Sequence, residues 1–149
     1  MTHDSLRPID PMGAQSIVGW RYTGPYSFYN TDPQRAAATL DEFLRPELAY
    51  HGVYDKKGAL IGFCCFGEAA RVPGGNYSEI GALDIGLGLR PDLTGKGLGT
   101  DFLGAILGFA EVRYAPTSFR ATIALFNQRS RRLFAHAGFE ERARFFADN

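Results

Sequence analysis

Between Leu83 and Leu103 the chain reads LDIGLGLRPDLTGKGLGTDFL, a hydrophobic stretch in which five residues are glycine. Glycine costs backbone entropy and weakens helices and strands alike, so this density needs a structural reason. In the first half, apolar side chains alternate with Asp84, Gly86 and Gly88, a pattern typical of a strand. The second half leads into an apolar helical pattern. The stretch therefore predicts a strand, a glycine-rich turn and a helix.

Such a turn is a general device for binding an anion, because the free N–H groups and the dipole at a helix start favour negative charge. The phosphate loop of nucleotide hydrolases requires Gly-Lys followed by Ser or Thr, but here Lys96 precedes another glycine. The dinucleotide fingerprint requires G-x-G-x-x-G, whereas residues 95–99 read G-x-G-x-G. The chain matches neither nucleotide-binding motif.

The remaining elements follow from caps and periodicity. Asp10-Pro11 and Asp32-Pro33 predict two helix starts, separated by an irregular aromatic loop over residues 20–30. We expect helix, helix, strand, strand, strand, helix, strand, helix and strand, with a short tail from Gly138. After the two N-terminal helices, the expected elements are a hairpin over 49–69, strands over 80–89 and 118–126, and helices over 100–114 and 127–137.

Composition narrows the function classes. We expect residues 1–149 to form a single domain, since domains commonly contain about 100 to 150 residues. Sixteen basic and sixteen acidic side chains balance, so we expect neither a nucleic acid nor a membrane partner. Cys64 and Cys65 are adjacent and cannot form an ordinary disulfide, which suits a cytoplasmic location. His51 and His136 lack metal-ligand partners at suitable spacing, so we expect no metal.

The stretch LGLRPDLTGKGLGTDFL resembles the acyl-CoA-binding motif of the GNAT N-acetyltransferase superfamily, Q/R-x-x-G-x-G/A after a central strand. Gly97 and Gly99 occupy the last two motif positions, while Thr94 stands where Gln or Arg is usual. Residues 126–139, FNQRSRRLFAHAGF, are similar to the family's next segment, in which an Asn begins a helix that ends in Gly-Phe.

The resemblance implies a mixed α/β (α+β) fold. Its sheet has six to seven mostly antiparallel strands, is flanked by about four helices and is splayed between the fourth and fifth strands. Acetyl-CoA is the implied co-substrate, with its pantetheine arm along the fourth strand and its pyrophosphate on the glycine loop. The bare face of Gly86 and Gly88 is expected to let the arm approach. The expected cofactor-binding residues are Leu87, Gly88, Leu89, Thr94, Gly95, Lys96, Gly97, Leu98, Gly99, Thr100, Asn127 and Phe134.

Acetyl transfer to an amine needs a base, because an alkyl amine with a pKa of about 10.4 is protonated at neutral pH. Asp84 is the first candidate, Glu79 the second and Glu68 a distant third. Many relatives have a tyrosine where this chain has Phe134, which has no proton to give. The general acid therefore stays open between water, Ser130 and a tyrosine of the aromatic loop.

These features predict an N-acetyltransferase that moves an acetyl group from acetyl-CoA directly to a primary amine within a ternary complex. Tyr22, Tyr26 and Tyr29 of the aromatic loop are expected to line the acceptor pocket. The acceptor, a small molecule or a peptide, stays open. The alternative is a non-catalytic acyl-CoA-binding module of the same fold. The short tail also leaves room for a homodimer in which a partner supplies a strand.

Overall fold

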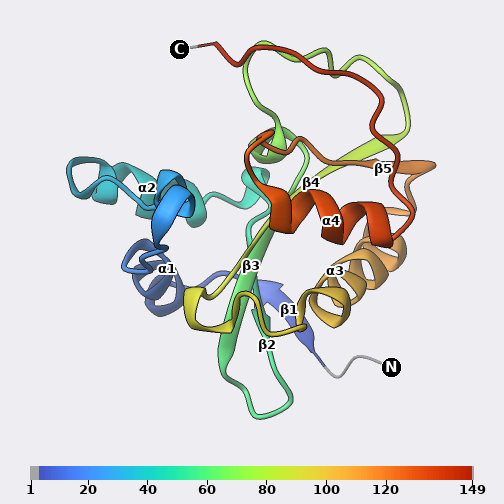
Figure 1. Cartoon of the computed structure of the whole chain (residues 1–149). Helices are drawn as coiled ribbons and strands as arrows, with labels where there is room; N and C mark the ends of the chain where they lie inside the picture. Colours follow the sequence, from blue (N-terminus) through green and yellow to red (C-terminus); the bar gives the residue numbers. More distant parts are fainter. Residues whose placement is uncertain (1–3, 149) are drawn as a thin grey trace.

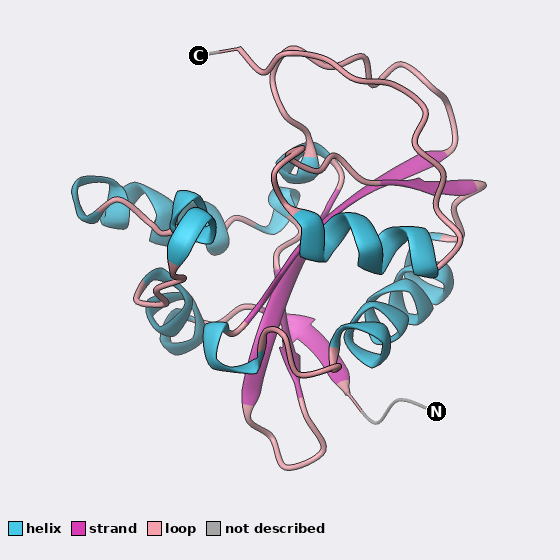
Figure 2. Cartoon of the chain, in the orientation of Figure 1, coloured by secondary structure: helices cyan, strands magenta, loops and turns pink. Residues whose placement is uncertain are grey.

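The computed structural model describes residues 4–148 and contains a five-stranded sheet in the order β1-β2-β3-β4-β5, whose strands are magenta in Figure 2. Neighbours from β1 to β4 pair antiparallel, and β4 pairs parallel with β5. The mixed α/β class is confirmed, although the described residues form five strands rather than six to seven. The strands are β1 (Ser5–Pro8), β2 (His51–Tyr54), β3 (Leu60–Phe66), β4 (Ala82–Leu89) and β5 (Ser118–Arg120), and the helices are α1 (Pro11–Val18), α2 (Ala36–Phe43), α3 (Gly99–Tyr114) and α4 (Gln128–His136).

Helices cover both faces of this sheet, with α1 and α2 on one side and α3 and α4 on the other (Figure 1). On the α3/α4 face, Ile85 of β4 packs with Ile106 and Phe134 in the larger core cluster. On the α1/α2 face, Ile17 and Phe43 form a second cluster against neighbouring partly buried rings. The interior strand β4 therefore presents a different environment on each face.

Caps define the helix starts that the sequence predicts. The Asp10 carboxylate accepts a hydrogen bond from Gly13 N at 2.7 Å, and α1 begins at the following proline. Asp32 caps a short 3-10 turn, η2 (Pro33–Arg35), which runs directly into α2. Asn127 caps α4 by accepting from Ser130 N at 3.1 Å.

Strand boundaries differ from the sequence predictions in three places. The four-residue β1 was not predicted, because SLRP is too short to show a period. The strand predicted over 118–126 ends at Arg120, and residues 139–148 contain no strand. This tail instead runs beside the 71–80 loop (Figure 1), where Asp148 N donates to Pro73 O at 2.9 Å.

The aromatic loop is also more regular than expected, since it contains the 3-10 helix η1 (Gly24–Tyr29). A 3-10 helix this short has no apolar period that a sequence pattern would reveal. Within residues 4–148, no helix combines the length and the apolar character that a membrane span requires.

Candidate functional site

The pairing between β4 and β5 is short and leaves a fork in the sheet. Ala82–Asp84 pair with Ser118–Arg120, and beyond this point the chain after β5 leaves the sheet. β4 continues to Leu89 with β3 on one edge, and no strand of the described residues 4–148 lies on the other. In Figure 1, β5 lies beside the start of β4 only. The fork lies where the sequence resemblance places the splay between the fourth and fifth strands.

Main-chain groups along β4 alternate between the two edges. Gly67 N donates to Asp84 O and Arg90 N donates to Ile61 O, both at 2.8 Å, so the even-numbered residues of β4 point toward β3. The main-chain groups of Leu87 and Leu89 therefore point into the fork. Those of Gly88 bond β3, which disagrees with its predicted role in pairing with a cofactor arm.

Positions 86 and 88 of β4 require glycine because neighbouring side chains of this chain fill the space beside them. A Cβ atom added to Gly88 would lie 2.4 Å from Phe63 Cε1, and one added to Gly86 would lie 3.0 Å from Cys65 Sγ. The expectation that this bare face admits a cofactor arm is therefore wrong. The Phe63 ring occupies the space and packs at 6.1 Å from Trp20 in the α1/α2 layer.

The loop after β4 presents open backbone. Gly95 and Gly97 have φ values of +73° and +76°, and an added Cβ would meet nothing within 4 Å at either position. Leu98, the N-cap residue of α3, makes no side-chain cap bond, so no cap side chain in the described part of the chain satisfies the first N–H groups of the helix. Lys96 is exposed beside them. This geometry suits a phosphate-bearing ligand.

Two other loop residues have local roles. A Cβ added to Gly99 would lie 3.1 Å from Leu133 Cδ1, so this glycine permits close packing between α3 and α4. The Thr94 hydroxyl donates to Pro91 O at 2.7 Å and closes the turn before the loop. Thr100 is exposed in the first turn of α3.

Tyrosines of the aromatic loop reach both sides of the fork. The Tyr22 hydroxyl donates to Leu89 O at 2.7 Å, and burial raises the pKa of Tyr22 to about 12. On the other side, Tyr29 Oη accepts from Asn127 Nδ2 at 3.1 Å. Tyr26 Oη accepts from the main-chain N–H at position 129, at 3.4 Å. The structure therefore brings these tyrosines and Asn127 together around the opening.

Phe134 lies elsewhere. Its ring is 5% exposed in the larger core cluster and contacts Phe139 edge-on, with ring centroids 4.9 Å apart. The geometry places this side chain in the core and not in the opening. Gly138, at φ +96°, lets the chain turn back so that these two rings meet.

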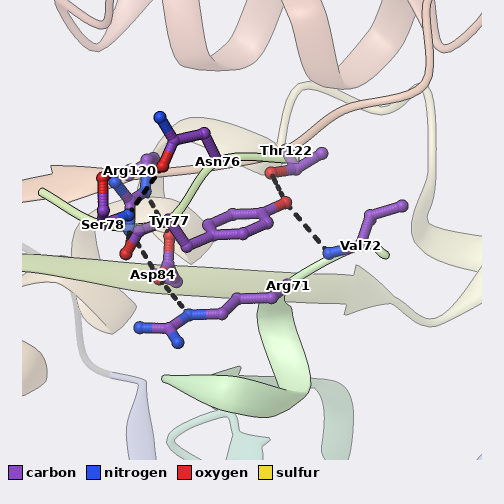
Figure 3. A network of polar contacts seen from close by, with 8 residues as sticks. All are labelled: Arg71, Val72, Asn76, Tyr77, Ser78, Asp84, Arg120 and Thr122. Carbon is purple, nitrogen blue, oxygen red and sulfur yellow. Dashed lines mark hydrogen bonds and ion pairs between the residues drawn. The ribbon is translucent and has the colours of Figure 1, made fainter. Parts of the chain in front are cut away.

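Asp84 is 2% exposed and bound by two arginines (Figure 3). Arg120 donates from Nε to Oδ1 at 2.6 Å and from Nη2 to Oδ2 at 3.0 Å, and Arg71 Nε donates to Oδ2 at 2.8 Å. Burial by itself raises the pKa of Asp84, but the bonds from Arg120 and Arg71 outweigh it and lower the pKa. Its carboxylate is thus a weak base that is already fully engaged, and the geometry favours a structural role.

Neither arginine was identified from the sequence, and neither was Tyr77, whose ring lies 4.9 Å from the Arg120 guanidinium carbon. Tyr77 Oη accepts from Val72 N at 2.9 Å and bonds the Thr122 hydroxyl at 2.7 Å (Figure 3). The sequence signal that could have identified Arg120 is its position as the one charged residue in the otherwise uncharged segment SFRATIALF.

The two glutamates that were predicted as alternative bases, Glu79 and Glu68, are exposed. Glu79 lies near enough to Arg120 to contribute to raising the pKa of that arginine. Within residues 4–148, no three His, Cys, Asp or Glu side chains converge as a metal-binding group.

Sequence and structure comparisons agree on one family. The family model of the acetyltransferase (GNAT) domain matches residues 6–140. No curated protein matches the chain in sequence. The aminoglycoside acetyltransferase AAC(6')-Ib, solved with ribostamycin and coenzyme A, has a TM-score of 0.73 at 18% identity, covering 93% of this chain and 84% of that chain.

A second solved structure shows the same fold. Mutant forms of the spermidine/spermine N-acetyltransferase SpeG from Vibrio cholerae have a TM-score of 0.67 at 17% identity, covering 98% of this chain and 87% of that chain. At these identities the structural similarities establish the fold, and the match to the family model establishes the relationship.

Proposed function

Because the chain belongs to the GNAT acetyltransferase family, we propose that it transfers an acetyl group from acetyl-CoA to a primary amine within a ternary complex. The family and the coenzyme A in solved neighbours of this fold support acetyl-CoA as co-substrate. Acetyl-CoA supplies an activated thioester. The residues of this chain bind it, orient it and move protons around it.

The observation that carries this proposal is the unpaired edge of β4. Pairing with β5 stops at Asp84, while the main-chain groups of Leu87 and Leu89 point into the fork, where the Leu89 carbonyl already accepts from Tyr22. Pantetheine carries amides that bond such an edge as a peptide strand does. Gly95, Lys96 and Gly97 then lie beyond the outer end of β4, where N–H groups and a positive charge suit the pyrophosphate.

For proton transfer, we assign the base to Glu79, with Glu68 as the alternative, because Asp84 is engaged by two guanidinium groups. The amine nitrogen forms the new C–N bond as its proton passes through water to the glutamate. The C–S bond breaks, and the thiolate takes a proton from Tyr29. Burial raises the pKa of Tyr29, so its hydroxyl is protonated at neutral pH. A Tyr29→Phe variant with unchanged kcat contradicts this last assignment.

Calorimetry with acetyl-CoA, followed by thiol release with a panel of amines, tests the proposal. We expect a binding heat from acetyl-CoA and amine-dependent release of free thiol. Binding without release from any amine instead supports the non-catalytic acyl-CoA-binding module. Neither heat nor release would exclude both functions.

A further inference from the structure

Arg71 uses little of its hydrogen-bonding capacity. Its Nε donates to Asp84, whereas the other four of its five N–H donors, on Nη1 and Nη2, have no partner among the described residues. These nitrogens point away from Asp84 in Figure 3, and the side chain is 43% exposed. Arg120, by contrast, gives the same carboxylate two bonds. Arg71 is therefore an oriented cation with free donors.

This cation lies at the closed end of the fork. Asp84 is the last residue of β4 that pairs with β5. Ala70, the residue before Arg71, lies over Gly86 on the α1/α2 face, since a Cβ added to Gly86 would be 3.6 Å from Ala70 Cβ. In the proposed cofactor position, an acyl group carried along the unpaired edge of β4 points toward this end of the fork. An amine that attacks it from the α1/α2 face therefore meets Arg71.

Ion pairs match the arginine charge here only in part. Two guanidinium groups share the single Asp84 carboxylate. Glu79 contributes to raising the pKa of Arg120, but it is exposed and no ion pair within the described residues joins it to either arginine. Like charge disfavours a polycationic acceptor at such a site. A guanidinium with a free edge instead binds a carboxylate through two parallel hydrogen bonds.

We propose that the acceptor is a small amine that also carries a carboxylate, and that Arg71 binds this carboxylate. The proposal rests on the acetyltransferase function and names its substrate class. That class differs from the aminoglycoside and spermidine acceptors in the names of the structural neighbours. Arg71 acts here in substrate binding, so its loss should raise KM more than it lowers kcat.

Matched amines test this class directly. Thiol release is measured at pH 7 with L-alanine, L-phenylalanine and β-alanine, with the carboxamide of each, and with spermidine and kanamycin. We expect kcat/KM to favour each acid over its amide by about tenfold to a hundredfold, the range for a charge-assisted hydrogen bond. The amides have the less basic amine and hence more of the reactive neutral form, so intrinsic reactivity does not produce this preference.

Variants of Arg71 test whether this residue causes the preference for acids over amides. We expect Arg71→Gln to abolish the preference through KM and Arg71→Lys to retain part of it, because lysine keeps the charge without the planar pair of donors. Arg142→Gln is the matched control, since Arg142 is 85% exposed on the tail. Acetyl-CoA affinity and Tm verify the fold, which the two bonds from Arg120 to Asp84 should maintain.

Three outcomes overturn the inference. Faster turnover of the amides or polycations rejects the substrate class while leaving the acetyltransferase function intact. An equal loss with acids and amides in folded Arg71→Gln and Arg71→Lys rejects the role of Arg71. Bound acetyl-CoA without thiol release from any amine rejects the acetyltransferase function and this inference with it.

Discussion

Asp84 is a buried charge on the interior strand β4, and its hydrogen-bond partners determine what it can do. We expect Asp84→Asn to lower the free energy of unfolding by about 2–3 kcal/mol at pH 7. This is less than the roughly 3–5 kcal/mol for breaking a fully buried pair, because both arginines still reach water. Urea unfolding measures the difference. Asp92→Asn, at an exposed ion pair, is the control and should change little.

The ion pairs of Asp84 also predict a pH dependence of stability. The pKa of Asp84 is lowered from its ordinary value of 3.8 in the folded state, so the contribution of its charge to folding stability is fully present above that pH. It is lost as the pH falls through the lowered pKa. The difference in unfolding free energy between wild type and Asp84→Asn should therefore shrink below pH 3.8. A difference that stays constant down to the acid transition contradicts the pairing.

A substitution at Gly88 distinguishes two reasons for a glycine there: close packing against Phe63 or clearance for a cofactor arm. Because an added Cβ would lie 2.4 Å from the Phe63 ring, we expect Gly88→Ala to destabilise the fold by about 1–3 kcal/mol through overpacking. Gly104→Ala is the control in α3, where an added Cβ meets nothing within 4 Å and helix propensity gains up to about 1 kcal/mol. Thermal unfolding compares the two. An unchanged Tm for Gly88→Ala, with weaker acetyl-CoA binding, would restore the bare-face interpretation.

At the scale of elements, the glycine loop presents N–H groups only while its backbone stays at positive φ. We expect Gly97→Ala to strain this positive-φ conformation by about 1–2 kcal/mol. If the loop relaxes to a negative φ, ligand binding has to restore the positive φ, so we expect acetyl-CoA affinity to fall about tenfold. Gly58→Ala in the β2–β3 turn is the matched control, with φ +85° and open space around it. Calorimetry should show normal affinity for the control; an equal fall in both variants contradicts a ligand role for the loop.

Sequence patterns predicted those elements whose signal is local. The caps of α1 and α4, the β2–β3 hairpin and the strand, glycine loop and helix all depend on residues within a few positions of one another. The end of β5 is not local. Thr122 bonds Tyr77, which lies 45 positions earlier and holds this segment to the 71–80 loop. A run of strand-forming residues therefore leaves the sheet after Arg120.

The predicted site also divides into residues with a local sequence signal and residues whose role depends on distant contacts. The loop glycines and Asn127 were selected by motif and the tyrosines as part of an aromatic loop; in the structure Tyr29 bonds Asn127 and Tyr22 bonds Leu89 O. The assignment of Asp84 as base failed to anticipate partners 13 and 36 positions away. Periodicity showed that Asp84 and Gly88 share the less apolar face of a strand. It did not show that arginines and an aromatic ring would fill that face.

At the scale of the whole molecule, the proposed site draws residues from both faces of the sheet. In this proposal the α3/α4 side supplies the glycine loop and Asn127, and the α1/α2 side supplies the aromatic loop and, through the 71–80 loop, Arg71. Strand β4 connects them, because its main chain faces the fork at every second residue. The account therefore predicts an alternating response of β4 to its ligand.

Amide hydrogen exchange with and without coenzyme A tests this most directly. We expect slower exchange on binding at Leu87 and Leu89 and in the loop at Gly95 and Gly97. Gly88, already bonded to β3, should not change. Slowing that is equal along β4, or confined to residues outside the fork and the glycine loop, would contradict the proposed cofactor site.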